Sequence, residues 1–307
     1  MDTVDPGADS KSAAAAQSAE KPAEKPAEKP TEKPAETPVG EPATRPPMRV
    51  TYALPGEADV VVRADLPYVG ASGSANSFDL YAAPGDSASK RPLVLVVFGV
   101  ADAAMERVIG TRLKNTSYLQ SWGRLLAAAG MLAVVPGVTA PEDDMPALLA
   151  QLREQADVLG IDATRIGLLA WSGHGPMALS LLRASVAAEP LRCLGLLNPY
   201  TLDRAGETRV AETVRSYGMA YPISGMTAAD LPTNVPLFIA RAGQDVFPFI
   251  NEAIDALVAD ALRLNLSLTL LNLPAAAHSF DMSVADPDAS AAIATLLAFL
   301  NLHLQAR

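Results

Sequence analysis

The sequence is poor in the residues that build disulfides and metal sites. Its 307 residues include one cysteine and three histidines. One cysteine excludes a disulfide within the chain, and no Cys/His cluster has the spacing of a zinc site. Cys193 lies in the apolar run 191–197, which predicts a buried small hydrophobic side chain. We therefore expect neither a structural disulfide nor a bound metal.

Basic residues and long hydrophobic runs are also scarce. The chain has 24 Lys and Arg against 34 Asp and Glu, a net charge of −10. Binding of nucleic acid needs a basic face, so no such partner is expected. The first thirty residues lack the apolar core of a signal peptide, and no run approaches a membrane span. These absences predict a cytoplasmic protein without a membrane partner, unless a start codon assigned too far downstream hides an export signal.

Residues 1–47 have almost no large apolar side chain to bury and form a tail rich in Ala, Glu, Lys and Pro. The tetrapeptide Ala-Glu-Lys-Pro occurs at 19–22, 23–26 and 27–30, and it drifts over 31–38. Proline at every fourth position removes helical donors and clashes with the preceding turn. The prediction is a disordered, partly polyproline-like spacer, with a docking motif as the alternative.

From Met48 onward, short apolar runs alternate with amphipathic segments, which is typical of an α/β fold. The pattern predicts one domain over 48–307, with a mostly parallel central sheet of about eight strands and helices on both faces. Runs at 60–62 and 78–82 predict antiparallel edge strands, and the unbroken run 93–98 predicts a strand covered on both faces. The aromatic-rich segment 198–235 has no clear period. Because it follows a strand on the ligand-binding side of the sheet, it predicts a cap or lid, with an ordinary structured excursion as the alternative.

A serine stands where a buried strand is expected to meet a helix. Residues 170–175 read Ala-Trp-Ser-Gly-His-Gly, after the apolar run 166–169 and before a helical pattern. This layout is typical of a nucleophile elbow, in which a tight turn exposes the Ser172 hydroxyl. Taken alone, such a serine more often serves as a helix N-cap.

Two later segments supply the groups that would activate Ser172. Asp245 ends Ala-Gly-Gln-Asp directly after the predicted strand 237–240, and His278 follows the predicted strand 266–271 by a short loop. A weakly nucleophilic serine needs a base, and the base needs an acid that fixes its tautomer. Alone, Asp245 could cap a helix and His278 could be a surface residue. In the order Ser, Asp, His they predict a catalytic triad.

The oxyanion hole and pocket are predicted from the same strand ends. One donor is the Gly173 N–H, and the second comes from the loop after 93–98, from Gly99 or Val100, with Val100 preferred. Phe98, Trp171 and Phe247 are candidate apolar pocket residues. His174 stands where a glycine is usual and has three interpretations: a ring packed beside the pocket, a substrate contact or alternate base, and a distorted, inactive elbow.

Together these motifs resemble the α/β-hydrolase superfamily, and within it the dienelactone-hydrolase-like proteins and small carboxylesterases. The resemblance covers 91–304 and rests on the elbow, on Ala-Arg-Ala-Gly-Gln-Asp at 240–245 and on Ala-His-Ser-Phe-Asp at 277–281. It implies the α/β-hydrolase fold, with Ser172 as nucleophile, Asp245 as acid and His278 as base. The departures are Ala170 and His174 beside the serine, and a missing His-Gly-Gly before the oxyanion loop.

The resemblance implies hydrolysis of a small carboxylic ester or lactone through an acyl-enzyme. No cofactor or metal is required, because the imidazole supplies the base that a metal-bound hydroxide would otherwise replace. Two alternatives stay open. One is a non-catalytic ligand-binding module on a hydrolase scaffold, and the other is an acyltransferase that uses the same triad.

Overall fold

The computed structural model describes residues 48–85, 89–185, 190–282 and 287–305. The predicted tail, residues 1–47, lies outside this part of the chain. The strands are β1 (Val61–Val69), β2 (Ala75–Ala82), β3 (Arg91–Val96), β4 (Leu132–Pro136), β5 (Ile161–Trp171), β6 (Cys193–Leu197), β7 (Leu237–Ala242) and β8 (Leu268–Leu273). The α-helices are α1 (Asp102–Ile109), α2 (Ser117–Ala128), α3 (Pro141–Glu154), α4 (Ala156–Leu159), α5 (Gly175–Ala184), α6 (Arg209–Ser216), α7 (Ile250–Arg263) and α8 (Pro287–Leu304).

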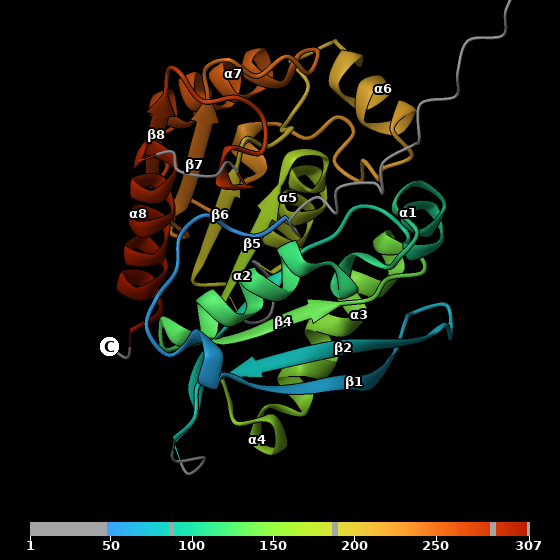
Figure 1. Cartoon of the computed structure of the whole chain (residues 1–307). Helices are drawn as coiled ribbons and strands as arrows, with labels where there is room; N and C mark the ends of the chain where they lie inside the picture. The colour runs from blue at the N-terminus through green and yellow to red at the C-terminus, as the bar shows by residue number, and fades with distance from the viewer. Residues whose placement is uncertain (1–47, 86–88, 186–189, 283–286, 306–307) are drawn as a thin grey trace, which may run out of the picture. The chain divides into compact units, whose positions relative to one another are not determined.

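The strands form one sheet in the order β1-β2-β4-β3-β5-β6-β7-β8 (Figure 1). β2 runs antiparallel to both of its neighbours, and the pairs from β4 to β8 are parallel. A mostly parallel sheet of eight strands confirms the predicted fold class. Every residue of β4 and β6 is buried, as expected for strands that helices cover on both faces.

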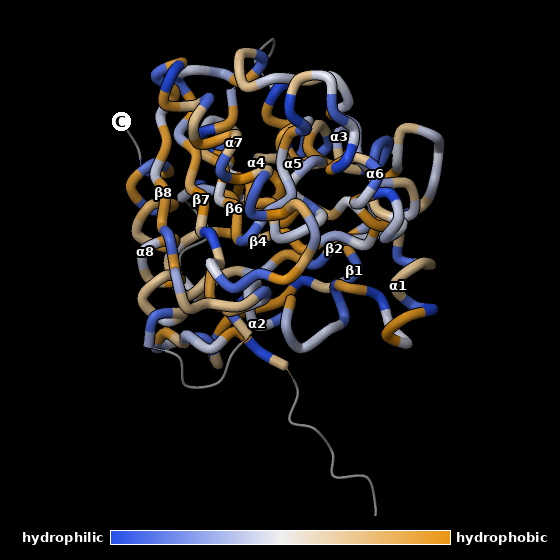
Figure 2. The backbone as a smooth tube through the Cα atoms, turned by 90° about the horizontal axis from the view of Figure 1, so that it is seen from above, coloured by the Kyte–Doolittle hydropathy of each residue, from blue (hydrophilic) through white to orange (hydrophobic). Residues whose placement is uncertain are grey.

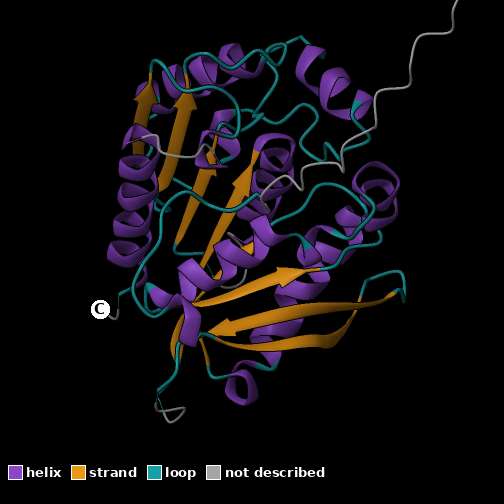
Figure 3. Ribbon diagram, viewed as in Figure 1, coloured by secondary structure: helices purple, strands orange, loops and turns teal. Residues whose placement is uncertain are grey.

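Helices pack on both faces of the sheet (Figure 3). α2 packs against β2 and β4, and its Gly123 lies directly over the Tyr81 ring, where a larger residue would collide with that ring. α3 and α5 contact β5, and α7 covers β7 and β8. Hydrophobic residues follow the central strands, as the colouring of Figure 2 shows for β6 and β7.

α8 packs on the sheet and is strongly apolar. Its 18 residues have a mean hydropathy of 1.2, long and apolar enough by composition to cross a membrane, which the sequence reading did not anticipate. In this structure it packs against β5, β6 and β7, with Leu296 on Gly195 and Leu304 on Gly167. We therefore interpret α8 as a core helix. Cys193, beside Gly167, is fully buried, and burial raises the pKa of its thiol to about 12.

The sequence prediction missed two helices, α1 and α6. α1 buries none of its residues, and α6 lies inside the aperiodic segment 198–235. The amphipathic pattern over 145–159 predicts one helix, but the structure has two there, because α3 ends at Glu154 and α4 begins at Ala156.

Candidate active site

The carboxyl ends of five strands carry the candidate site. β3 leads to Phe98 and Gly99, β5 to Ser172, β6 to Asn198, β7 to the loop with Asp245, and β8 to the loop with His278. Parallel strands bring these ends to one edge of the sheet, where open α/β sheets bind ligands.

Ser172 lies at the turn between β5 and α5. β5 ends at Trp171, and a 3-10 turn, Ser172–His174, leads into α5. Ser172 has φ 47°, a left-handed conformation that costs a residue with a side chain about 1–3 kcal/mol. Asn198 (φ 38°) and Ser279 (φ 58°) share this conformation and line the same cavity as Ser172. Backbone strain of this kind gathers at functional sites, which supports the prediction of an elbow.

The elbow accommodates His174 because the close approaches fall on the two glycines beside it. A Cβ at Gly175 would collide with the carbonyl oxygen of Tyr200, and a Cβ at Gly173 would collide with the sulfur of Met219. The Tyr200 N–H also donates to the Ser172 carbonyl oxygen at 2.9 Å. The His174 side chain points away from these contacts, towards the loop after β3.

His278 and Asp245 form a buried pair. The distance from His278 Nδ1 to Asp245 Oδ2 is 2.6 Å, and the two side chains are 15% and 0% exposed. Asp245 Oδ1 accepts the Phe247 N–H at 3.0 Å. The two loops approach closely at Gly243, where a Cβ would lie 2.6 Å from the Pro274 carbonyl oxygen. An ionised carboxylate can only accept, so His278 Nδ1 is the donor and Nε2 keeps its lone pair.

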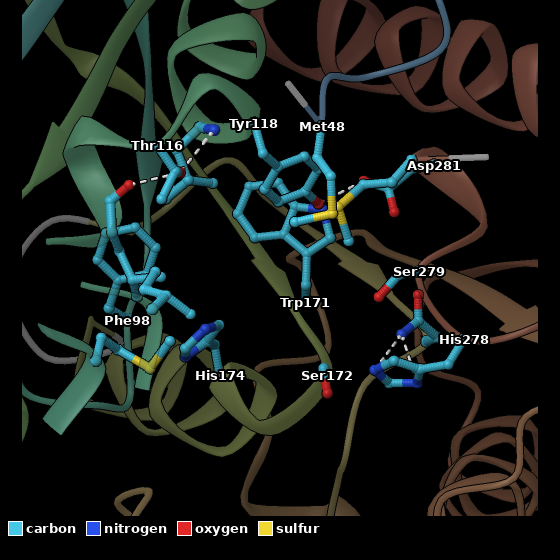
Figure 4. A pocket seen from close by; sticks show the side chains of 16 residues that line it. Met48, Phe98, Thr116, Tyr118, Trp171, Ser172, His174, His278, Ser279 and Asp281 are labelled. Carbon is cyan, nitrogen blue, oxygen red and sulfur yellow. Dashed lines mark hydrogen bonds between the residues drawn. The ribbon is translucent and has the colours of Figure 1, made fainter. Parts of the chain in front are cut away.

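Ser172 and His278 face one cavity of about 310 Å³ (Figure 4). Among the described residues, the Ser172 hydroxyl makes no hydrogen bond. The hydrogen bond between a catalytic serine and its histidine base often forms only when substrate is bound. The cavity wall is largely apolar, and the apolar side chains include Phe98, Met105, Ile109, Leu113, Leu119, Trp171 and Met282.

The predicted pocket residues lie in different places. Phe98, Trp171 and His174 line the cavity. Phe247 is absent from the cavity wall, 38% exposed, and its ring centroid lies 4.3 Å from that of His278. It covers the histidine from outside because its backbone N–H is held by Asp245.

The loop after β3 distinguishes the two predicted oxyanion donors. The Gly99 N–H donates to His174 Nδ1 at 3.0 Å and is therefore occupied. The N–H groups of Val100 and Gly173 donate no hydrogen bond within the described part of the chain. Both are thus available to an oxygen of a ligand.

The sequence assigned no role to five polar residues of the cavity wall, which are Thr116, Tyr118, Asn198, Ser279 and Asp281. Two of them, Asn198 and Asp281, are buried. Asn198 is 2% exposed, and its Nδ2 lies 3.2 Å from His278 Nδ1 and 3.4 Å from Nε2. Asp281 is fully buried and accepts from the Tyr118 hydroxyl (2.5 Å) and the Trp122 indole (3.1 Å), while burial raises the pKa of its carboxyl group. Asp281 thereby ties the His278 loop to α2. The sequence does contain a sign of Asn198's role, because Asn198 directly follows the apolar run 191–197, and residues at strand ends often line the site in this fold.

Comparison with known proteins gives structural matches only. No family model matches the chain, and a search of the curated proteins found no match. Among solved structures, esterase Est22 has a TM-score of 0.60 at 18% identity, covering 80% of this chain and 82% of its own. A variant of esterase rPPE in complex with (S)-Ac-CPA has a TM-score of 0.63 at 14% identity, covering 82% and 85%. A bacterial heroin esterase has a TM-score of 0.61 at 16% identity, covering 81% and 86%.

This protein has the α/β-hydrolase fold. The strand order, the elbow after β5 and the order Ser, Asp, His agree with that fold. At such low identity the likeness extends to the fold alone, so activity has to be argued from the site.

Proposed function

We propose that this α/β-hydrolase-fold protein is a serine hydrolase that cleaves a small carboxylic ester or lactone. The observation that carries the proposal is the 2.6 Å contact between His278 Nδ1 and Asp245, beside the cavity that Ser172 enters from a strained turn. The structural neighbours Est22, rPPE and heroin esterase are esterases by name, which supports an ester as the substrate. The sequence around His278 supports the dienelactone-hydrolase-like or small carboxylesterase group.

In the proposed reaction, Ser172 Oγ attacks the carbonyl carbon while His278 Nε2 takes its proton. The tetrahedral intermediate collapses as the bond to the leaving oxygen breaks and His278 returns the proton to that oxygen. Water then attacks the acyl-enzyme, again with His278 as base, and releases the acid and free Ser172. Asp245 holds the tautomer and stabilises the imidazolium in both halves.

The negative oxygen of each tetrahedral intermediate would bind to the N–H groups of Gly173 and Val100. Both donors are unoccupied among the described residues, whereas Gly99 is not. Backbone donors in a water-poor site are worth about 3–4 kcal/mol each to the transition state. Of the two candidates for the second oxyanion donor, Gly99 and Val100, we therefore propose Val100.

The cavity favours a neutral substrate. Asp281 is the one acidic residue of its wall, and no Lys or Arg lies among the described residues that line it. A volume of about 310 Å³ lies at the small end of the range for small-molecule pockets. A short aliphatic or aryl ester fits this volume and this apolar wall.

We propose further that the segment 198–235 caps the site. Asn198 lines the cavity, Tyr200 holds the Ser172 carbonyl, and Met219 lies against Gly173. Tyr217 also packs on Phe247 at 5.8 Å between ring centroids, which continues the cover over His278.

Labelling with a fluorophosphonate probe tests the function. We expect the wild type to be labelled, and Ser172→Ala and His278→Ala to lose the label. Ser267→Ala removes an exposed serine at the amino end of β8, outside the cavity wall, and it should be labelled like the wild type. A folded wild-type protein that takes no label would contradict the hydrolase and favour a binding module.

A further inference from the structure

The proposed reaction uses neither ring nitrogen of His174, and only Nδ1 has a hydrogen-bond partner among the described residues. Its Nδ1 accepts the Gly99 N–H at 3.0 Å, so Nδ1 carries no proton. A neutral imidazole with a bare Nδ1 has its proton on Nε2. His174 is therefore held as an uncharged ring whose Nε2–H is a donor. Burial acts in the same direction and lowers the pKa of His174 to about 4.

The Nε2–H group of His174 faces the cavity. It makes no hydrogen bond to any described residue, and it is absent from the buried polar atoms that lack a partner, so it is accessible. The cavity beside Ser172 is the space that His174 lines, with Phe98 packed against the ring at 5.4 Å between centroids. An accessible donor in a largely apolar wall is a feature that orients a ligand.

The position of His174 decides which part of an ester it would meet. His174 and His278 lie on opposite sides of Ser172 (Figure 4). The leaving oxygen has to lie near His278, because that residue returns the proton to it. The acyl group then extends to the other side, towards His174. The carbonyl oxygen has its own donors in Gly173 and Val100, which leaves His174 for a second oxygen.

We propose that His174 selects esters whose acyl chain carries an uncharged acceptor oxygen, such as an ether or keto oxygen, near the carbonyl carbon. This inference rests on the proposed function and specifies its substrate class. A donor without a basic lone pair discriminates against acyl groups that leave it unpaired. It also has no positive charge with which to attract a carboxylate.

Two esters of equal size test the proposal. p-Nitrophenyl methoxyacetate and p-nitrophenyl butanoate differ by one oxygen in place of a methylene group. Because the ether raises intrinsic reactivity, the measured quantity is the ratio of their kcat/KM values in each enzyme. We expect the wild-type ratio to exceed that of His174→Met by roughly three- to ten-fold, the range of one hydrogen bond. His174→Gln keeps an acceptor for Gly99 and a donor for the cavity, so it should retain most of the preference.

A binding measurement separates this inference from the proposed function. In Ser172→Ala the same two esters bind without reacting, and their Kd values should show the same preference, which is lost when His174→Met is added. In ¹⁵N-labelled Ser172→Ala protein, the Nε2 resonance of His174 should shift with the methoxyacetate ester and not with the butanoate ester. Equal ratios in wild type and His174→Met, or no such shift, would overturn the role of His174. Loss of hydrolysis and labelling in the wild type, with the binding preference intact, would instead overturn the hydrolase.

Discussion

Two histidines flank Ser172, and their ring nitrogens have opposite roles. His278 donates its Nδ1–H to the Asp245 carboxylate, whereas His174 accepts a backbone N–H at Nδ1. The first partner leaves a lone pair on Nε2, and the second leaves a proton there. The same side chain thus becomes a base on one side of the serine and a donor on the other.

The comparison shows that the partner of Nδ1 sets the chemistry of a cavity-facing imidazole. His278 has a negative charge behind it, which stabilises the imidazolium formed in the reaction. His174 has a peptide dipole behind it whose positive end points at the ring, which opposes protonation. Substitution of Asp245 should therefore change the protonation of the His278 ring and leave that of His174 unchanged.

The largest effect is expected from Asp245→Asn. An amide can present its NH₂ group to Nδ1, which would move the proton to Nε2 and make His278 resemble His174. For this kind of change in a triad, kcat falls by about 10⁴-fold. Steady-state kinetics on p-nitrophenyl butanoate would measure it. Asp255→Asn, which loses only an ion pair with Arg241 on the surface, should keep kcat within two-fold of the wild type. A drop below ten-fold in Asp245→Asn would refute the acid role.

The second prediction concerns the pH dependence of stability at His174. Its pKa is lowered to about 4 in the fold, against about 6.5 in an unfolded chain. Between these values the unfolded state binds a proton that the folded state does not, so the free energy of unfolding falls as pH falls. The difference amounts to about 3 kcal/mol between pH 7 and pH 4.

Urea unfolding at pH 7 and at pH 4.5 of wild type and His174→Gln would measure this contribution. Glutamine does not titrate, so the acid loss of stability should be smaller in the variant. Equal acid losses in the two proteins would show that His174 titrates normally and that its ring is not held neutral.

Much of the fold follows from patterns that are local in the sequence. The buried runs that become β3 to β7 are apolar on both faces, so each was visible as an unbroken run. Ser172 and Asp245 come a few residues after two of these runs, and His278 comes after the predicted strand 266–271 and a short loop. Their order along the chain is Ser, Asp, His, which identified them as a triad. Helix α1 was missed because none of its residues is buried in the core, and its Met105 and Ile109 line the cavity instead.

The features that the sequence did not predict depend on contacts between distant segments. The tautomer of His174 is set by Gly99, 75 residues away in the chain. The burial of the Asp281 carboxylate depends on the hydrogen bonds that Tyr118 and Trp122 of α2 donate to it. Phe247 was predicted to line the pocket. Its backbone N–H instead donates to the Asp245 carboxylate, and its ring packs against His278. Pairings of this kind have no period and no fixed spacing.

The third prediction adds Asn198 to the comparison, because only His278 has an amide against its ring. Asn198 Oδ1 is buried without a partner, and half a turn of the amide would bring it to the ring. An oxygen there would stabilise the imidazolium. We expect Asn198→Gly to lower kcat by about ten-fold, because the amide oxygen next to the ring attracts the charge of the imidazolium and the glycine variant lacks it. KM should change little.

The backbone at Asn198 supplies the control for this variant. Its φ of 38° suits Asn and Gly, and a Cβ without a polar partner costs about 1–2 kcal/mol there. Asn198→Ala should therefore unfold at lower urea concentration than Asn198→Gly, while both lose the same factor in kcat. If kcat is lower in Asn198→Ala than in Asn198→Gly, in step with the lower stability, the Asn198 side chain has only a structural role.

The smallest effect is expected on the exposed side of His278. The Phe247 ring lies 4.3 Å from the imidazole and is 38% exposed, so it orients the ring more than it buries it. Aromatic pairs of this kind contribute about 0.5–1.5 kcal/mol beyond burial. Phe247→Leu should lower kcat/KM by roughly two- to five-fold. The ratio between the methoxyacetate and butanoate esters should stay unchanged, because that ratio depends on His174. A change in the ratio would mean that the two histidines do not act independently across Ser172.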